Sequence, residues 1–278
     1  MKLKGKIIAF AGAVALAAAL SIAFPRLDGQ LEAAESSGKT LRYVKNDAFG
    51  YGEKLEYRVG YKFVTAGTGY FQIQPNPVLV NGRESYDVRF QVRSLKSLEW
   101  IYKVVDDYRT VLDVAGIFPW EFNQRIREGN YKKDYTAKFD QYNNKAYVGK
   151  KSYNVPEYVH DIVSAFFYVR TMDLGSMKNG STFYLKNFFD DETNNLGVKV
   201  LKREKVSVAA GTFNCIVIEP LVVKGGLFKN EGNIFIWLTD DDRKIPVKVA
   251  TKILIGYVSA ELTGYSGTRG PVAAKVGK

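Results

Sequence analysis

The sequence contains one cysteine and one histidine in 278 residues, and this scarcity excludes several kinds of chemistry. Because Cys215 stands alone, no intrachain disulfide can form. A Ser-His-acid triad or a zinc site of the usual kinds would have to be built on His160. The sequence also has no G-x-S-x-G and no H-E-x-x-H motif. We therefore predict that the protein is not an enzyme and has no catalytic residue, no metal site and no cofactor.

The one long uncharged apolar run lies at the N-terminus. Lys2, Lys4 and Lys6 precede it, and it extends from Ile7 to Phe24. A basic start followed by an apolar segment is typical of an export signal. We expect residues 1–33 to be a signal peptide; the alternative is an uncleaved anchor formed by residues 7–24. Either way, the expected location is the periplasm of a bacterium of the Gram-negative type.

The sequence lacks a long run of lysine or arginine, although its net charge is +11. In the cell envelope, a basic protein is attracted to anionic lipid headgroups or acidic glycans. We therefore expect an anionic membrane surface or an envelope glycan as a partner, and not nucleic acid. The alternative is that scattered charges serve only solubility. The sequence leaves the oligomeric state open.

Aromatic residues are abundant, at 14%, and they alternate with polar residues in a way that indicates strands. In KLEYRVGYKF, every second residue from Leu55 to Phe63 is apolar, and most of those between are charged. A period of two places the apolar set on one face of a strand, whereas a helix would scatter it. This segment therefore predicts a sheet with one apolar and one wet face.

The same alternation recurs along most of the chain, with turn residues such as Asn81-Gly82 between the segments. Further strands are expected at 108–112, 120–127, 135–139, 182–189, 198–201, 213–219, 234–239, 245–249 and 253–262. One segment, DIVSAFFYVRTM, has helical spacing, with Asp161 placed to cap its first turn. We predict a mainly β fold: a large curved antiparallel sheet, or an incomplete or closed β-barrel, with one short helix packed on or in it.

Composition sets the expected domain boundaries. Residues 34–46 are polar and have no sustained period, so we expect a linker there. Residues 47–265 form a single β domain in this interpretation. Residues 266–278 are rich in glycine and basic residues, which predicts a disordered basic tail.

The acidic triplet Asp240 to Asp242 lies between two apolar segments and is the most conspicuous candidate metal site. Aspartate is a common turn former, and the alternating ligands and glycine of a calcium loop are missing. We predict a hairpin turn. For His160 we expect a local hydrogen bond beside the helix cap, and for Cys215 a buried position in a strand.

The apolar face of the sheet is the remaining candidate for function. A curved sheet either fills its interior with side chains or leaves space for a hydrophobic ligand, and the sequence leaves both open. If a ligand binds, the expected contacts come from one face of the first strand, with a tryptophan near the rim. These ligand-binding residues are Tyr57, Val59, Tyr61, Phe63 and Trp237.

Four stretches together resemble a family of exported bacterial proteins known as domain of unknown function 3108 (DUF3108). They are FGYGEKLEYRVGYKFVTAGTGYF, DIVSAFFYVRTMDLGS, VAAGTFNCIVIEP and IWLTDDDRKIPVKVATKILIGYVSAEL. The resemblance extends from Phe49 to Leu262 and implies export and an antiparallel β domain. It implies no activity and assigns no site residues to this chain, because none is established for that family. More distantly, a Trp-bearing strand that turns through aspartates and returns through a proline is similar to half-barrel periplasmic lipoprotein carriers.

Three functions remain open at this point. The first is a non-enzymatic periplasmic protein that binds or carries a lipid or another hydrophobic ligand in a concave apolar β face. The second is a structural or assembly protein that docks to envelope polysaccharide or to another envelope protein. The third is a hydrolase that uses two carboxylates, which would require a cleft with paired acids.

Overall fold

The computed structural model describes residues 39–61, 64–223, 234–253 and 256–277. The expected signal segment, residues 1–33, lies outside these ranges. Within them, no helix has both the length and the apolar character needed to cross a bilayer.

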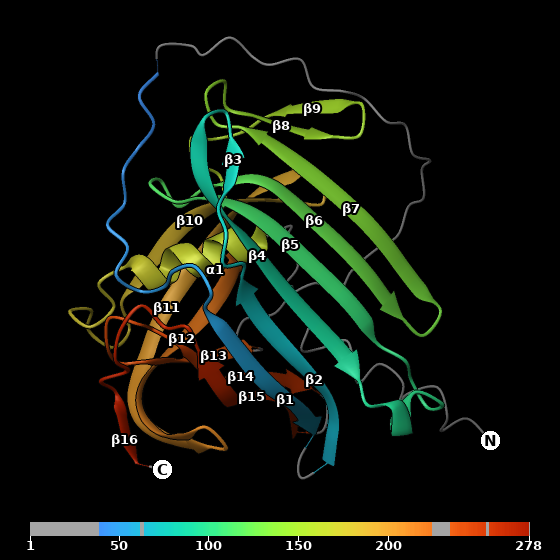
Figure 1. The fold of residues 1–278 in the computed structure, drawn as a ribbon, viewed down its shortest axis with the longest axis vertical. Helices are drawn as coiled ribbons and strands as arrows, with labels where there is room; N and C mark the ends of the chain where they lie inside the picture. Colours follow the sequence, from blue (N-terminus) through green and yellow to red (C-terminus); the bar gives the residue numbers. More distant parts are fainter. Residues whose placement is uncertain (1–38, 62–63, 224–233, 254–255, 278) are drawn as a thin grey trace.

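Sixteen strands of the described chain join in one sheet, and all neighbouring strands are antiparallel (Figure 1). The strands are β1 (Lys54–Tyr61), β2 (Val64–Ile73), β3 (Val78–Val80), β4 (Arg83–Ser94), β5 (Val105–Asp113), β6 (Pro119–Glu128), β7 (Tyr131–Asp140), β8 (Lys145–Val148), β9 (Lys151–Asn154), β10 (Thr182–Phe189), β11 (Glu192–Val208), β12 (Gly211–Val223), β13 (Ile234–Thr239), β14 (Pro246–Ile253), β15 (Gly256–Ser266) and β16 (Lys275–Gly277). The predicted fold class is confirmed.

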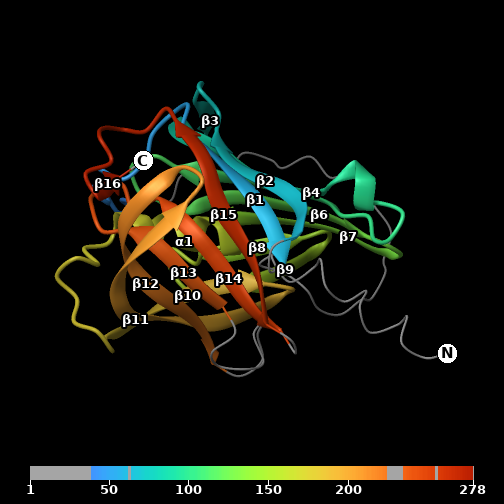
Figure 2. The ribbon, with the colours of Figure 1, turned by 90° about the horizontal axis from the view of Figure 1, so that it is seen from below.

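The strand order explains how distant parts of the sequence become neighbours. It runs β10-β11-β12-β13-β14-β15-β1-β2-β4-β5-β6-β7-β8-β9, with β16 paired to β12 and β3 to β4. The first strand of the domain therefore lies at the centre, beside β15. Because β10 and β9 are the two ends of this order, the sheet is strongly curved but is not closed into a barrel (Figure 2).

Helix α1 (Ile162–Thr171) lies on the concave side of the sheet, between its two halves (Figure 2). One side of α1, including Ile162 and Phe167, packs with β4 to β7. The other side, including Ala165 and Val169, packs with β11 to β13. An apolar helix must bury its apolar positions, and the curved sheet covers this one from both sides.

The start of α1 follows the sequence prediction. Asp161 Oδ1 accepts hydrogen bonds from the backbone N–H groups of Val163 (2.7 Å) and Ser164 (2.9 Å). Its second oxygen, Oδ2, accepts from the Thr110 hydroxyl of β5 at 2.6 Å. One carboxylate therefore caps the helix and ties it to the sheet.

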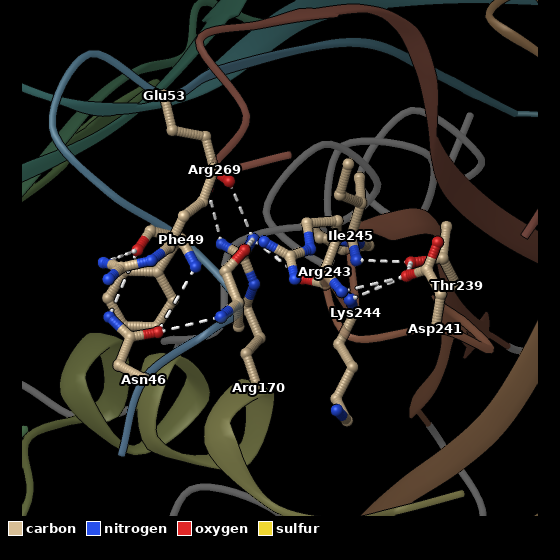
Figure 3. Close-up of polar contacts among 12 residues, drawn as sticks. Asn46, Phe49, Glu53, Arg170, Thr239, Asp241, Arg243, Lys244, Ile245 and Arg269 are labelled. Carbon is tan, nitrogen blue, oxygen red and sulfur yellow. Dashed lines mark hydrogen bonds and ion pairs between the residues drawn. The ribbon is translucent and has the colours of Figure 1, made fainter. Parts of the chain in front are cut away.

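The end of α1 is tied to the other half of the molecule by a buried ion pair (Figure 3). Arg170 donates to both carboxylate oxygens of Glu53, at 2.6 and 2.9 Å, and to the Arg243 carbonyl at 3.1 Å. The guanidinium also lies over the rings of Phe49 and Phe167, at 5.1 and 5.2 Å. Both ends of the helix are therefore fixed by charged groups.

The expectation of a linker at residues 34–46 is wrong for the described residues 39–46. Leu41 is buried against Phe118 and Trp120. The Arg42 guanidinium donates to the carbonyls of Gly116 (2.8 Å) and Ile117 (3.0 Å). The Val44 N–H also donates to the Ala115 carbonyl at 2.8 Å. A short polar segment has no periodicity of its own, so its sequence did not reveal these contacts with distant residues.

The prediction of a disordered tail at residues 266–278 is wrong for the described residues, which extend to 277. Strand β16 pairs with β12, and the Asn214 N–H donates to the Ala274 carbonyl at 2.9 Å. The Ala274 N–H donates to Asp241 Oδ2 at 2.9 Å. The glycine-rich composition indicated a segment without its own core, but it did not reveal the strand edge that this segment covers.

Candidate functional site

The concave face leaves a cavity of about 50 Å³ beneath α1. Strands β13, β14, β15, β1, β2, β4 and β5, which follow one another in the sheet, contribute lining residues, and α1 contributes the others. Its lining side chains include Tyr57, Val59, Phe71, Phe90, Val92, Tyr108, Ile162, Phe166, Ile236, Val249 and Ala260. The surface that faces the space is wholly apolar, and the cavity is partly open.

Aromatic rings form much of this wall. Phe71 stacks on Phe90 with ring centroids 4.2 Å apart, and on Phe166 of α1 with centroids 5.6 Å apart. The Tyr57 hydroxyl is directed away from the space and donates to the Pro246 carbonyl at 2.8 Å. Because this hydroxyl is satisfied elsewhere, Tyr57 presents only its ring to the cavity.

A cluster of polar groups adjoins the cavity across the ring of Tyr108. Asp106 and Tyr108 share the inner face of β5, and Gln124 and Glu128 share the inner face of β6, because residues two and four apart point to the same side of a strand. Tyr108 and Gln124 are directly paired in the sheet. These four residues, which we call the polar chamber, are all buried.

Within the described ranges, most of the polar atoms in the chamber have no well-formed hydrogen bond to the rest of the chain. This holds for the Tyr108 hydroxyl, both polar atoms of the Gln124 amide, Asp106 Oδ2 and Glu128 Oε1, although the Gln124 amide is near enough to the Tyr108 hydroxyl to lower its pKa, in part offsetting the effect of burial. From outside the chamber, Asp106 Oδ1 accepts a hydrogen bond from the Arg127 N–H at 3.0 Å. Buried polar groups are normally paired, so a concentration of unpaired ones in one place requires an explanation.

The two carboxyl groups of the chamber hold a proton between them. Burial, and then the charge of Asp106 and a hydrogen bond with it, raise the pKa of Glu128 to about 8. Burial also raises the pKa of Asp106. Two like charges in a dry site cannot both persist, so at neutral pH Glu128 keeps its proton and donates it to Asp106.

The sequence-predicted binding residues divide between two faces. Tyr57 and Val59 line the cavity, and Tyr61 packs against the core formed by the same strand face. Phe63 lies outside the described residues. Ile236 lines the cavity, but the next residue, Trp237, does not. The Trp237 indole N–H instead donates a hydrogen bond to the Glu204 carboxylate at 2.6 Å. The sequence did not reveal which side of β13 faces the cavity, and binding by any of these residues stays a prediction.

His160 and Cys215 have structural surroundings. His160 Nδ1 lies 3.3 Å from the Ser164 hydroxyl, and burial lowers the pKa of this histidine well below its usual value. Although Asp161 and Ser164 are close, Asp161 is engaged by the helix cap and Thr110. Burial, followed by nearby acidic charge, raises the pKa of the Cys215 thiol to about 12, so it is not a thiolate at neutral pH.

The acidic triplet is the predicted turn between β13 and β14 (Figure 3). Asp241 Oδ1 accepts from the Thr239 hydroxyl (2.7 Å) and from the N–H groups of Arg243 (3.0 Å) and Lys244 (3.2 Å). Asp240 pairs with Arg203, and Asp242 projects into solvent. Across the described ranges, no group of three or more His, Cys, Asp or Glu side chains is arranged to hold a metal ion.

Sequence reasoning missed the polar chamber. The segments VDDYRTVLD and PWEFNQRIRE do alternate, and polar residues occupy several positions on what becomes the inner face. An acid or an amide at an inward position of a predicted strand is the available signal. That signal did not show that Asp106 and Glu128 would meet, because their contact depends on the register between β5 and β6.

Comparison with solved structures finds folds of the same general kind. A β-barrel-like protein of domain of unknown function DUF1849 from Brucella abortus aligns with a TM-score of 0.50 and 12% identity, covering 82% of this chain and 99% of that one. A candidate lipoprotein from Parabacteroides distasonis aligns with a TM-score of 0.35 and 10% identity, covering 82% and 100%. The first likeness supports the fold alone, and the second carries no argument.

The family comparison is more specific. A search of the curated proteins gives no match. The family model described as "Protein of unknown function (DUF3108)" matches residues 56–263, which include every lining residue of the cavity and all four residues of the polar chamber. This chain therefore belongs to the DUF3108 family.

Proposed function

We propose that this protein is a non-enzymatic binding protein of the bacterial cell envelope that holds the apolar part of an amphiphilic ligand inside its curved sheet. The observation that carries the proposal is the apolar cavity between α1 and the concave face. Protein interiors are close-packed, and an unfilled apolar space lowers stability. A wholly apolar lining favours a hydrocarbon group over a polar one. The export signal expected at residues 1–33 supports the envelope location.

The cavity is small for this role, so ligand entry requires the lining to open. Its volume of about 50 Å³ compares with about 150 Å³ for a cavity that admits benzene and about 300–1,000 Å³ for common ligand pockets. Phe166 is half-buried and stacks on Phe71, so its rotation would enlarge the partly open cavity. Because Asp161 and Arg170 fix both ends of α1, we expect side chains to move rather than the whole helix.

Binding of a hydrocarbon probe tests the proposal. We expect purified protein to raise the fluorescence of an apolar dye such as N-phenyl-1-naphthylamine, and a C12 fatty alcohol to displace the dye. Ala260→Leu, which fills the cavity from β15, should abolish the signal. Thr68→Leu adds a similar side chain on the exposed face of β2 and should leave it unchanged. No fluorescence change with any of these proteins would end the proposal.

A second candidate function, docking to an anionic lipid surface, is favoured by one exposed patch. The loop between β4 and β5 presents Trp100, which is 83% exposed, and Ile101. Val64 of β2 is also exposed, and Leu95 beside the loop donates to the Ala66 carbonyl at 2.9 Å. Lys96 and Lys103 are exposed on the same loop. Tryptophan with neighbouring lysines is typical of a membrane interface.

Sedimentation with lipid vesicles tests this docking. We expect the protein to bind phosphatidylglycerol vesicles and not phosphatidylcholine vesicles, and Trp100→Ser with Ile101→Ser to weaken binding. Leu79→Ser removes an exposed apolar side chain from β3, at the opposite end of the sheet, and serves as the control (Figure 1). Equal loss with the control variant would contradict docking by this loop. A stoichiometric protein crosslinked in intact cells would instead favour the assembly function.

A hydrolase that uses two carboxylates would require a cleft with paired acids, and Asp106 and Glu128 are such a pair. Both carboxyl groups are buried, however, so a substrate would have to enter the interior of the sheet. The absence of catalysis therefore remains a prediction. It is tested by incubating the protein with chromogenic glycosides and esters, where turnover that Glu128→Gln abolishes would overturn it.

A further inference from the structure

We infer that the polar chamber is a subsite for an ammonium group, so that the ligand is an amine-bearing amphiphile with its hydrocarbon tail in the apolar cavity. This inference rests on the proposed function and names the chemical class of the ligand. Its basis is the concentration of unpaired acceptors on the inner ends of β5 and β6, in contact with the cavity wall. Apart from the proton that Glu128 shares with Asp106, no donor of the described residues reaches Asp106 Oδ2, Glu128 Oε1 or the Gln124 carbonyl oxygen.

The composition of the chamber favours a cation over other polar groups. An ammonium group offers three N–H donors and one positive charge. Its entry releases the proton of Glu128 to solvent, and the two carboxylates and the Gln124 amide oxygen then accept the three N–H groups. A carboxylate or phosphate headgroup would add negative charge beside Asp106 and Glu128 and would be repelled. Tyr102 and Tyr131 lie near the acids: burial raises the pKa of both phenols, and Glu128 adds to the shift, together with Asp106 at Tyr102 and after Asp190 at Tyr131. Their rings provide faces that also attract a cation.

The position of Tyr108 connects the chamber to the cavity. Its ring lines the apolar space, while its unpaired hydroxyl belongs to the polar cluster. Val92, which also lines the cavity, is the direct sheet partner of Asp106. A hydrocarbon tail that begins at the acids can therefore pass Tyr108 and Val92 and continue against Phe71 and Phe90. One ligand would satisfy the unpaired acceptors and fill the unfilled space.

Water is the principal alternative occupant, because bound water also satisfies buried polar groups. Water and an ammonium group differ in charge, and this difference decides the choice of probes. Dodecylamine, dodecanol and dodecanoate share one chain length and differ only in the polar end. Their binding to the full chain is measured by displacement of N-phenyl-1-naphthylamine at pH 7, and by the shift that each ligand causes in the thermal unfolding midpoint.

We expect dodecylamine to bind at least about tenfold more tightly than dodecanol, because it forms charge-assisted hydrogen bonds, and dodecanoate to bind most weakly. Asp106→Asn with Glu128→Gln should remove the advantage of the amine and leave dodecanol binding within about threefold. Asp134→Asn with Glu192→Gln removes the same formal charge from exposed positions of β7 and β11 and should leave the advantage intact. If the double chamber variant does not fold, Glu128→Gln alone serves in the same assay.

The possible outcomes separate this inference from the proposed function. Equal binding of amine and alcohol, or an amine advantage that survives the chamber substitutions, would overturn the ammonium subsite while leaving a hydrocarbon-binding protein. Loss of the advantage in the exposed control variant would show attraction by the overall charge and would also overturn it. If none of the three ligands binds, the proposed function itself fails.

Discussion

Two buried charged sites in this protein differ in whether their charges are opposite and their hydrogen-bonding groups are paired. We call the first kind matched and the second unmatched. Arg170 and Glu53 have opposite charges, form two direct hydrogen bonds, and are 0% and 1% exposed at their side chains. Asp106 and Glu128 have like charges, and three further polar atoms beside them lack partners. The first site uses almost all of its hydrogen-bonding capacity inside the protein; only Arg170 Nε is unpaired.

The difference teaches where to look for function in a fold without catalytic motifs. A matched buried pair holds elements together, and here it joins the end of α1 to the start of β1. An unmatched cluster lowers stability unless a ligand, water or a proton satisfies it. We therefore assign a structural role to Arg170 and Glu53, and direct the binding experiments at Asp106 and Glu128.

The largest expected effect is at the matched pair. Arg170→Met leaves Glu53 buried without its partner, and breaking such a pair typically costs about 3–5 kcal/mol of unfolding free energy. Chemical denaturation measures this loss. The double variant Arg170→Met with Glu53→Gln should recover part of it, because no uncompensated charge remains. A loss below about 1 kcal/mol in the single variant would mean that this pair does not anchor the helix.

Asp161 is a third buried carboxyl group, and it lies between the two extremes. It has no cationic partner, but it accepts from two backbone N–H groups and from Thr110. Asp161→Ala removes the cap, worth about 1 kcal/mol, and leaves the Thr110 hydroxyl only the Glu121 carbonyl, at 3.1 Å, as its acceptor, so we expect a total loss of about 1–2 kcal/mol. Asp161→Asn keeps an acceptor for the helix and should lose less. Equal losses in the two variants would contradict the capping role.

The unmatched pair, Asp106 and Glu128, should make the free energy of unfolding depend on pH. Glu128 has a pKa of about 8, above its usual 4.5, so the folded protein binds more protons than the unfolded chain between these values. Its stabilising contribution is complete below about pH 4.5 and is lost as the pH rises through about 8. Because Asp106 and Glu128 interact, the two carboxyl groups titrate as a unit. The charges of Arg93 and Asp107 act on the pKa of Asp106. The two acids in turn affect the pKa values of three neighbouring phenols, those of Tyr102, Tyr108 and Tyr131.

Glu128→Gln isolates that contribution. Between pH 5 and pH 9, we expect the wild type to lose on the order of 2 kcal/mol more unfolding free energy than this variant. Urea denaturation at a series of pH values gives the two curves. Parallel curves would show that the carboxyl pair does not carry a shared proton, and would weaken the distinction between the two buried sites.

Local sequence signals predicted most of the elements that position the site. Alternation gave β1, β6 and β13 to within a few residues, and a single capping residue, Asp161, gave the start of α1. Turn chemistry gave the role of Asp241. These features depend on neighbours close in the chain, which is why a sequence pattern contains them.

Features that depend on distant contacts were not predictable in the same way. Glu53 and Arg170 are separated by 117 positions. The side that Trp237 faces depends on how β13 pairs with β12 and β14, and the docking of residues 39–46 and 267–277 depends on surfaces formed elsewhere. The cavity depends on how tightly α1 packs against several strands. Alternation assigns a residue to one face of its strand, but it gives neither strand register nor packing density.

Two tyrosines in the cavity wall provide the smallest and most closely matched test. Tyr57 and Tyr108 are both buried, and both present their rings to the same cavity. The Tyr57 hydroxyl donates to the Pro246 carbonyl at 2.8 Å, whereas the Tyr108 hydroxyl has no acceptor among the described residues. Replacing tyrosine by phenylalanine removes only the hydroxyl in each case. The two substitutions therefore compare a satisfied polar atom with an unsatisfied one in nearly the same surroundings.

We expect Tyr57→Phe to lower the unfolding free energy by about 1 kcal/mol, because it leaves the Pro246 carbonyl without its donor. Tyr108→Phe should change it by less than about 0.5 kcal/mol, or raise it, because an unpaired hydroxyl leaves the interior. Denaturation of both variants under one condition gives the difference directly. A loss at Tyr108 as large as that at Tyr57 would mean that the Tyr108 hydroxyl has a partner in solution. Bound water would then explain the acid pair better than an ammonium subsite does.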